Sequence, residues 1–180
     1  MARAVWLITG IPGAGKATVA RQPAGRCRRS APVEGDALHL WVEGGRVLPG
    51  EGPAGEASRQ IWLCVRHRCP PARSFAGTEF TPVVHYAMAG RGILAAYRER
   101  LADLDLRLVV LAPGVETALR RDRERQQKTV AARWMHLEAE MAAALGGLGC
   151  RPDLSARTPA ETVAAILRRR TRVRLGGGPP

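Results

Sequence analysis

A glycine-rich stretch near the start of the chain, GIPGAGKATVA at residues 10–20, has the residue types and spacing that bind phosphate groups. Gly10 is followed, after four intervening residues, by Gly15 and Lys16, which is the Walker A arrangement of a phosphate-binding loop (P-loop). Glycines there let backbone N–H groups converge on phosphate oxygens, and the positive end of the following helix points at them. The lysine reaches the outer phosphates as a point charge. The spacing therefore predicts a nucleotide site composed of Gly10, Ile11, Pro12, Gly13, Ala14, Gly15, Lys16, Ala17 and Thr18.

Position 17 departs from the pattern of such loops. A serine or threonine normally stands there and supplies a hydroxyl to the magnesium ion, whereas Ala17 has no side-chain oxygen. Thr18 does not simply replace it, because one step along a helix turns a side chain by about 100°. Thr18 is better placed to contact an inner phosphate. We therefore expect nucleotide binding to survive and magnesium placement, and with it turnover, to suffer; the metal ligands stay unassigned.

Apolar runs alternate with helical patterns along the chain, which predicts a parallel α/β sheet with right-handed crossovers. The predicted strands are residues 4–9, 31–36, 81–87, 106–113 and 150–154. The predicted helices are residues 16–22, 56–76, 92–103, 114–127, 130–145 and the stretch that follows 158.

Prolines and caps set the expected helix boundaries. Pro23 is expected to end or kink the first helix, and Pro70-Pro71 to break or bend the second, because an interior proline removes a backbone donor. Before the last helix, Thr158 and Glu161 have the spacing of a capping box.

The composition is that of one folded domain. The chain has 180 residues, of which 46% are apolar, and a formal net charge of +12. Positive charge favours anionic partners. However, lysine occurs only at Lys16 and Lys128, and the other basic residues are arginines. With abundant alanine, glycine and proline, this pattern indicates a coding bias, so nucleic acid is not the partner we predict.

The cysteines and the apolar runs indicate the compartment. The four cysteines include no CxxC pair and show no zinc spacing, and the N-terminus lacks the pattern of a signal peptide. No apolar run reaches the roughly 18–20 residues that cross a bilayer. The sequence therefore predicts a cytoplasmic protein with reduced thiols and no membrane span, and it leaves the oligomeric state open.

Five segments resemble small bacterial P-loop kinases. They are GIPGAGKATVA, VEGDALH, TPVVHYAMAGRG, RLVVLAP and LRRDRERQQKTVAARW. The group is often labelled AAA-family ATPase-like and includes the chloramphenicol phosphotransferase and gluconate kinase relatives; the resemblance covers residues 4–167. It implies a three-layer P-loop NTPase (nucleoside-kinase-like) fold, with a parallel five-stranded sheet flanked by helices. It also implies a domain over residues 1–170 with a small lid at about 119–133, leaving 171–180 as a flexible tail.

The resemblance also implies roles on the acceptor side and at the metal. In such kinases an aspartate that ends the second strand binds the acceptor hydroxyl and serves as general base, and Asp36 is the matching residue. A helix or turn cap is the alternative role for it. Glu34 and His39 are weaker candidates for substrate contact. The third strand usually ends in a carboxylate that anchors the magnesium shell, whereas this chain has His85 and Tyr86 there.

The lid of such kinases closes over the nucleotide, and the matching segment 119–133 is rich in arginine. Guanidinium groups pair with phosphates and stabilise charge on the transferred group. Of these arginines, Arg121, Arg125 and Arg133 are the predicted phosphate contacts; the others fit a solvated helix face. Trp134 and His136, which follow in a helical pattern, are predicted to be packing residues.

These patterns together predict a kinase of a hydroxylated small molecule that uses ATP and Mg²⁺. Its predicted catalytic residues are Asp36, Lys16 and Arg125. A nucleotide-binding protein with little kinase activity is the first alternative, because Ala17 and His85 both weaken the metal site. A nucleic-acid-end kinase is the second, which would bind oligonucleotides less tightly as salt is added.

Overall fold

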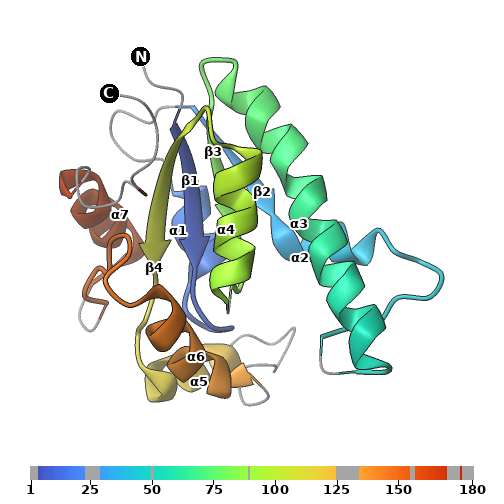
Figure 1. Ribbon diagram of the computed structural model, residues 1–180. Coiled ribbons are helices and arrows are strands. Elements are labelled where there is room, and N and C mark those ends of the chain that lie inside the picture. Colours follow the sequence, from blue (N-terminus) through green and yellow to red (C-terminus); the bar gives the residue numbers. More distant parts are fainter. Residues whose placement is uncertain are drawn as a thin grey trace.

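A parallel sheet forms the centre of the computed structural model (Figure 1), which describes residues 4–22, 29–49, 51–88, 90–124, 134–154, 157–169 and 175. Within these residues, four strands pair in the order β2-β3-β1-β4. Their bounds are β1 Ala4–Thr9, β2 Ser30–Glu34, β3 Thr81–His85 and β4 Asp105–Val110. Because all four run parallel, their carboxyl ends meet at one edge of the sheet, where loops gather the candidate site.

The predicted fifth strand is wrong in the described residues. At 150–154 the chain makes only an isolated parallel bridge, between Cys150 and Val109. The Cys150 N–H donates to the Leu108 carbonyl and its own carbonyl accepts from the Val110 N–H, both at 2.9 Å. The next donor along the ladder would be residue 152, which is a proline and has no N–H. Pairing therefore stops after one residue.

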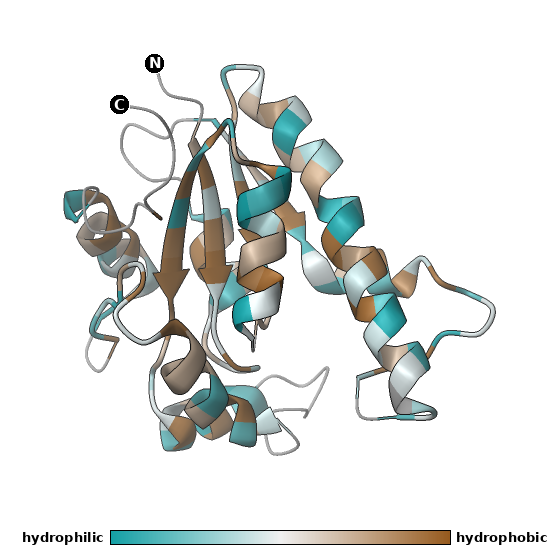
Figure 2. Ribbon diagram, viewed as in Figure 1, coloured by the Kyte–Doolittle hydropathy of each residue, from teal (hydrophilic) through white to brown (hydrophobic). Residues whose placement is uncertain are grey.

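Helices cover both faces of the sheet. Their bounds are α1 Lys16–Arg21, α2 Gly35–Leu40, α3 Ala54–Ala76, α4 Arg91–Arg100, α5 Val115–Glu124, α6 His136–Leu145 and α7 Pro159–Arg168. Alternate strand residues point to opposite faces, so the sheet buries apolar side chains on both of its faces. Val84 and Leu108 pack with α3 and α4 on one face, while Val83 and Val109 pack with α1 and α7 on the other. The strands are accordingly apolar along most of their length (Figure 2).

The expected break at Pro70-Pro71 is wrong, because α3 runs through both prolines. Pro70 is exposed and Pro71 is half-buried, so both lie away from the face that packs on the sheet. That face, which includes Arg68 and Ala72, is fully buried. Burial of the helix face therefore outweighs the hydrogen bonds that the prolines remove.

The boundary between β2 and the helix that follows it also differs from the prediction. Strand β2 ends at Glu34, and the next residues form the short helix α2 instead of continuing the strand to residue 36. Helix α1 ends at Arg21, close to the predicted end; Pro23 lies outside the described residues. The capping box before α7 is confirmed, because the Thr158 side chain accepts from the Glu161 N–H and the Glu161 carboxylate accepts from the Thr158 N–H.

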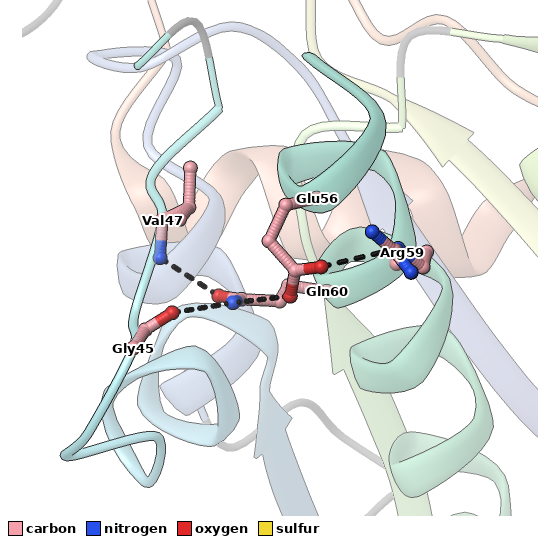
Figure 3. Close-up of polar contacts among 5 residues, drawn as sticks. All are labelled: Gly45, Val47, Glu56, Arg59 and Gln60. Atoms are coloured by element: carbon pink, nitrogen blue, oxygen red, sulfur yellow. Dashed lines mark hydrogen bonds and ion pairs between the residues drawn. The ribbon is translucent and has the colours of Figure 1, made fainter. Parts of the chain in front are cut away.

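The segment that follows α2 is held against α3 by one buried side chain (Figure 3). Gln60 accepts a hydrogen bond from the Val47 N–H at 2.9 Å and donates to the Gly45 carbonyl at 2.8 Å. Glu56, one turn earlier on α3, accepts a second hydrogen bond from Gln60 at 2.9 Å and forms an ion pair with Arg59. An amide that satisfies both a donor and an acceptor of this loop gives the loop a defined position.

Candidate functional site

The glycine-rich loop connects the end of β1 to α1 and is closely packed against Leu111, which follows β4, and against α5. Gly13 and Gly15 have φ angles of 81° and 89°, which side chains rarely adopt, and Gly15 is the residue that precedes α1. A Cβ on Gly13 would overlap the backbone carbonyl of Ala118 in α5. A Cβ on Gly10 would overlap the carbonyl of Leu111 and come within 2.9 Å of the Ala14 Cβ. The loop therefore requires glycine for its packing as well as for its turn.

Lys16 lies over the loop that precedes it. Its ammonium group donates to the Gly10 carbonyl at 2.9 Å and to the Ile11 carbonyl at 3.1 Å. These two carbonyls orient the lysine across the concave side of the loop, at the N-terminal end of α1. Phosphate oxygens bound there would be attracted by the positive end of the helix and could accept hydrogen bonds from the backbone N–H groups and from this ammonium group.

A cavity of about 340 Å³ adjoins the loop, between α1, α5 and the start of α7. Its volume lies within the range of small-molecule sites. The cavity has an apolar side, which suits a flat base, and charged groups near the loop. The lining residues are Ala14, Gly15, Thr18, Val19, Arg121, Glu124, Leu154, Arg157, Pro159 and Thr162.

Two arginines bring positive charge to this cavity. Nη1 of Arg121 lies 3.9 Å from the place that a Gly15 Cβ would occupy, so its guanidinium group is beside the loop. Arg157 lines the same cavity and donates to the Asp153 carbonyl at 2.9 Å. The sequence prediction included Arg121 and missed Arg157, whose only signal was its position before α7. Arg125 and Arg133 lie outside the described residues, so their predicted contacts stay predictions.

Asp36 lies in the first turn of α2 and is exposed. The prediction that it ends a strand is therefore wrong, although its position just after β2 brings it to the carboxyl edge of the sheet. Gly35 explains the change of structure at this point. A Cβ on Gly35 would come within 2.6 Å of the Tyr86 ring and 2.9 Å of the Arg68 guanidinium group. Only glycine lets the chain turn into α2 this close to both side chains.

A buried arginine supports the turn that carries Asp36. Arg68 of α3 is fully buried and donates to the Gly35 carbonyl at 3.2 Å and to the Tyr97 hydroxyl at 3.1 Å. Its guanidinium carbon lies 3.7 Å from the centre of the Tyr86 ring. Burial raises the pKa of Tyr97 to about 12, against the opposing effect of Arg68, so its hydroxyl stays neutral. The arginine thus joins α2, α3, α4 and the end of β3, a role that the sequence did not indicate.

Glu34 and His39, the weaker candidates for substrate contact, already have partners. The Glu34 carboxylate forms an ion pair with Arg21 of α1 at 3.0 Å. His39 is buried, with Nε2 3.1 Å from the Val47 carbonyl and Nδ1 3.7 Å from the Cys64 sulfur. The structure therefore gives His39 a structural role.

His85 occupies the end of β3, opposite Ile8 of β1 and Glu34 of β2. Its side chain is buried, and Nε2 has no hydrogen-bond partner among the described residues. Burial lowers the pKa of His85. Lys16 and Arg21 lower it further, while Glu34 and Asp36 oppose the shift. A neutral imidazole therefore stands where the resemblance implies a carboxylate.

This shift predicts an acid sensitivity that is specific to His85. Its folded-state pKa lies below the unfolded value, so the unfolded chain binds the proton more readily. The stabilising effect is complete above the unfolded pKa of about 6.5 and is lost as the pH falls toward the folded pKa. We expect His85→Gln to flatten the decrease in unfolding free energy between about pH 7 and pH 5, measured by denaturant titration. His67→Gln, on the exposed side of α3, is the control that should retain the wild-type slope.

The residues present do not fit the magnesium site that the resemblance implies. All 16 aspartate and glutamate residues of the chain lie in the described residues, as do all four histidines. Among the described residues, none of these side chains cluster in groups of three or more that could hold a metal ion. Ala17 offers no oxygen, His85 offers a nitrogen, and Glu34 is paired with Arg21. Magnesium prefers oxygen ligands, and neither position 17 nor position 85 supplies one.

Trp134 precedes α6, and His136 is the first residue of that helix. Their rings are 5.9 Å apart. Trp134 is half-buried, as expected of a packing residue, whereas His136 is exposed. The packing prediction for His136 is therefore wrong, since the core contacts of this helix come from Met141 and Leu145.

Comparisons with known proteins identify the fold. No protein-family model matches the chain, and no curated protein sequence does. A gluconokinase from Sinorhizobium meliloti 1021 superposes with a TM-score of 0.67 at 18% identity, over 94% of each chain. A sugar kinase from Janibacter sp. HTCC2649 gives 0.67 at 19% identity over 96% of each chain. A tunicamycin resistance protein from Deinococcus radiodurans gives 0.66 at 16% identity, over 98% of this chain and 99% of that one.

These sequence identities are low, so the structural similarity shows the fold of this chain and does not indicate its substrate. Among the helices that the structure describes, none combines the length and the apolar character that a bilayer span requires. This chain is an α/β domain with a four-stranded parallel sheet flanked by helices, and that fold matches these structures. The chain has the fold of the small P-loop kinases.

Proposed function

We propose that this protein is an ATP-binding phosphotransferase that acts on a hydroxyl group of a small molecule. The observation that carries the proposal is the placement of two groups around His85. Lys16 of the phosphate loop and Asp36 of α2 are both close enough to shift the pKa of this buried imidazole, in opposite directions. Because β3 lies between β1 and β2, the loop that carries Lys16 and the turn that carries Asp36 leave the sheet on either side of His85.

Each side chain has a defined role in this proposal. The loop amides and Lys16 hold the outer phosphates of ATP, and the cavity between α1, α5 and α7 takes the base. The acceptor oxygen attacks the γ-phosphorus, its proton passes to the Asp36 carboxylate, and ADP leaves. Lys16 and Arg121 reduce the negative charge that builds up on the transferred group. Arg68 keeps the turn of Asp36 in place and takes no part in the transfer itself.

A transfer assay with a panel of acceptors tests this function. The panel consists of hydroxylated metabolites and antibiotics, each incubated with ATP labelled on the γ-phosphate, and the product is a labelled acceptor. We expect one structural class of acceptor to be labelled, at a rate that depends on acceptor concentration. Release of labelled inorganic phosphate, with no acceptor labelled, would contradict the proposal.

A nucleotide-binding protein with little kinase activity is the second candidate. Ala17 and His85 favour it, because both lie where magnesium-dependent kinases of this fold have oxygen ligands. It predicts ATP binding with no labelled acceptor in the same assay. Measuring ATP affinity and turnover on one preparation separates the two candidates.

A further inference from the structure

We infer that this site binds its nucleotide without help from a divalent cation, and that cationic side chains neutralise the phosphates in the ion's place. The inference rests on the nucleotide site of the proposed function, but not on phosphate transfer. It follows from the mismatch between the magnesium ligands that the fold implies and the side chains that this loop presents.

Side-chain carboxylates are the oxygen ligands that such an ion would need. Every Asp and Glu of the chain lies in the described residues, so no carboxylate side chain outside them can complete a site. Near the loop, Glu34 is paired with Arg21 at 3.0 Å, and Asp36 is exposed in the first turn of α2, where the proposed function uses it as the base. Glu124 lines the nucleotide cavity, where its side chain is 67% exposed and lies 3.9 Å from Arg120. At the two positions that would face the ion, Ala17 and His85 present a methyl group and an imidazole.

Positive charge, in contrast, is concentrated at the same place. Lys16 lies across the loop, the Arg121 guanidinium group is beside Gly15, and Arg157 lines the cavity. Neither Arg121 nor Arg157 forms an ion pair with a carboxylate of the described residues, although the charge of Arg157 also acts on the exposed Glu161 carboxylate. Their charge is therefore available to a phosphate chain, and guanidinium groups match phosphate oxygens in geometry as well as in charge.

The consequence for binding follows from linkage. An ion can raise the affinity for ATP only if it gains contacts in the complex that it lacks in solution. A magnesium ion carried by ATP gains no side-chain oxygen from Ala17 or His85. It also cancels two of the negative charges that Lys16, Arg121 and Arg157 would attract. The affinity for ATP should therefore be equal with and without magnesium, or higher without it.

Calorimetric titration of the full chain with ATP tests this inference, once in excess EDTA and once in excess MgCl₂. We expect the dissociation constant in EDTA to be no more than about twofold above that in MgCl₂. A dissociation constant that falls by about threefold or more when magnesium is supplied would overturn the inference.

A matched pair of variants tests the cause. Ala17→Ser adds a hydroxyl at the half-buried start of α1, and we expect magnesium to tighten ATP binding to this variant by about tenfold. Ala17→Cys has the same shape but a soft sulfur, which suits magnesium poorly, and it should remain insensitive to the ion. If the serine variant is as insensitive as wild type, the missing oxygen is not the cause and the inference fails.

The two proposals fail in distinguishable ways. ATP binding in EDTA without any labelled acceptor would retain this inference and remove the kinase function. ATP binding that needs magnesium, together with a labelled acceptor, would retain the function and remove this inference. If ATP binds in neither buffer, both are wrong.

Discussion

Lys16→Ala should weaken ATP binding by about 10- to 150-fold, because the loop loses its own ammonium group. Hydrogen bonds to charged groups contribute about 1.5–3 kcal/mol each. The upper part of the range applies if several phosphate oxygens share the ammonium group, and the backbone amides and the helix end of α1 retain the remaining affinity. Isothermal titration with ATP measures the effect.

Two checks make the Lys16 result interpretable. The variant also loses the hydrogen bonds to the Gly10 and Ile11 carbonyls, so its fold is verified by circular dichroism before titration. Arg73→Ala removes one positive charge from an exposed ion pair with Asp103, which precedes β4 at the opposite edge of the sheet. It should bind ATP as wild type does. An unchanged dissociation constant in a folded Lys16→Ala variant would place the nucleotide elsewhere.

Asp36→Asn should leave ATP binding intact and lower the rate of transfer by about 10²- to 10⁴-fold, the usual contribution of a positioned base. The amide has the size of the carboxylate but cannot take the acceptor's proton. Because Asp36 is exposed, the substitution disturbs no packing, and the loss of its charge from the first turn of α2 costs at most about 1 kcal/mol. The decrease should therefore appear in kcat and not in the affinity for ATP.

Glu43→Gln is the control for this experiment, since it removes one negative charge from the exposed loop that follows α2. It should retain wild-type transfer with the acceptor identified in the panel assay. If Asp36→Asn transfers phosphate as fast as wild type, Asp36 serves only to stabilise the start of α2, the alternative that the sequence left open.

The features that depend on residues close together in the sequence were determined by the sequence alone. The phosphate loop, the strands around it and the Thr158–Glu161 capping box follow from short-range geometry: glycines that permit a turn, apolar runs that bury a strand, and a hydroxyl three residues before a glutamate. Arg121 of α5 lies beside the loop, and its predicted contact with the phosphates stays a prediction.

Features that depend on distant residues were decided by the tertiary structure. Helix α3 continues through two prolines because its opposite face is buried on the sheet, and β2 ends early because Gly35 fits between Tyr86 and Arg68. Nothing in the sequence distinguishes Arg68 from the other arginines of this basic chain. In the structure, α2, α4 and the end of β3 enclose it. Local patterns do not encode such encounters, since burial and electrostatic energies depend on which segments the fold brings together. The sequence therefore predicts a nucleotide loop, while the packing around it decides how Asp36 is supported and why His85 is neutral.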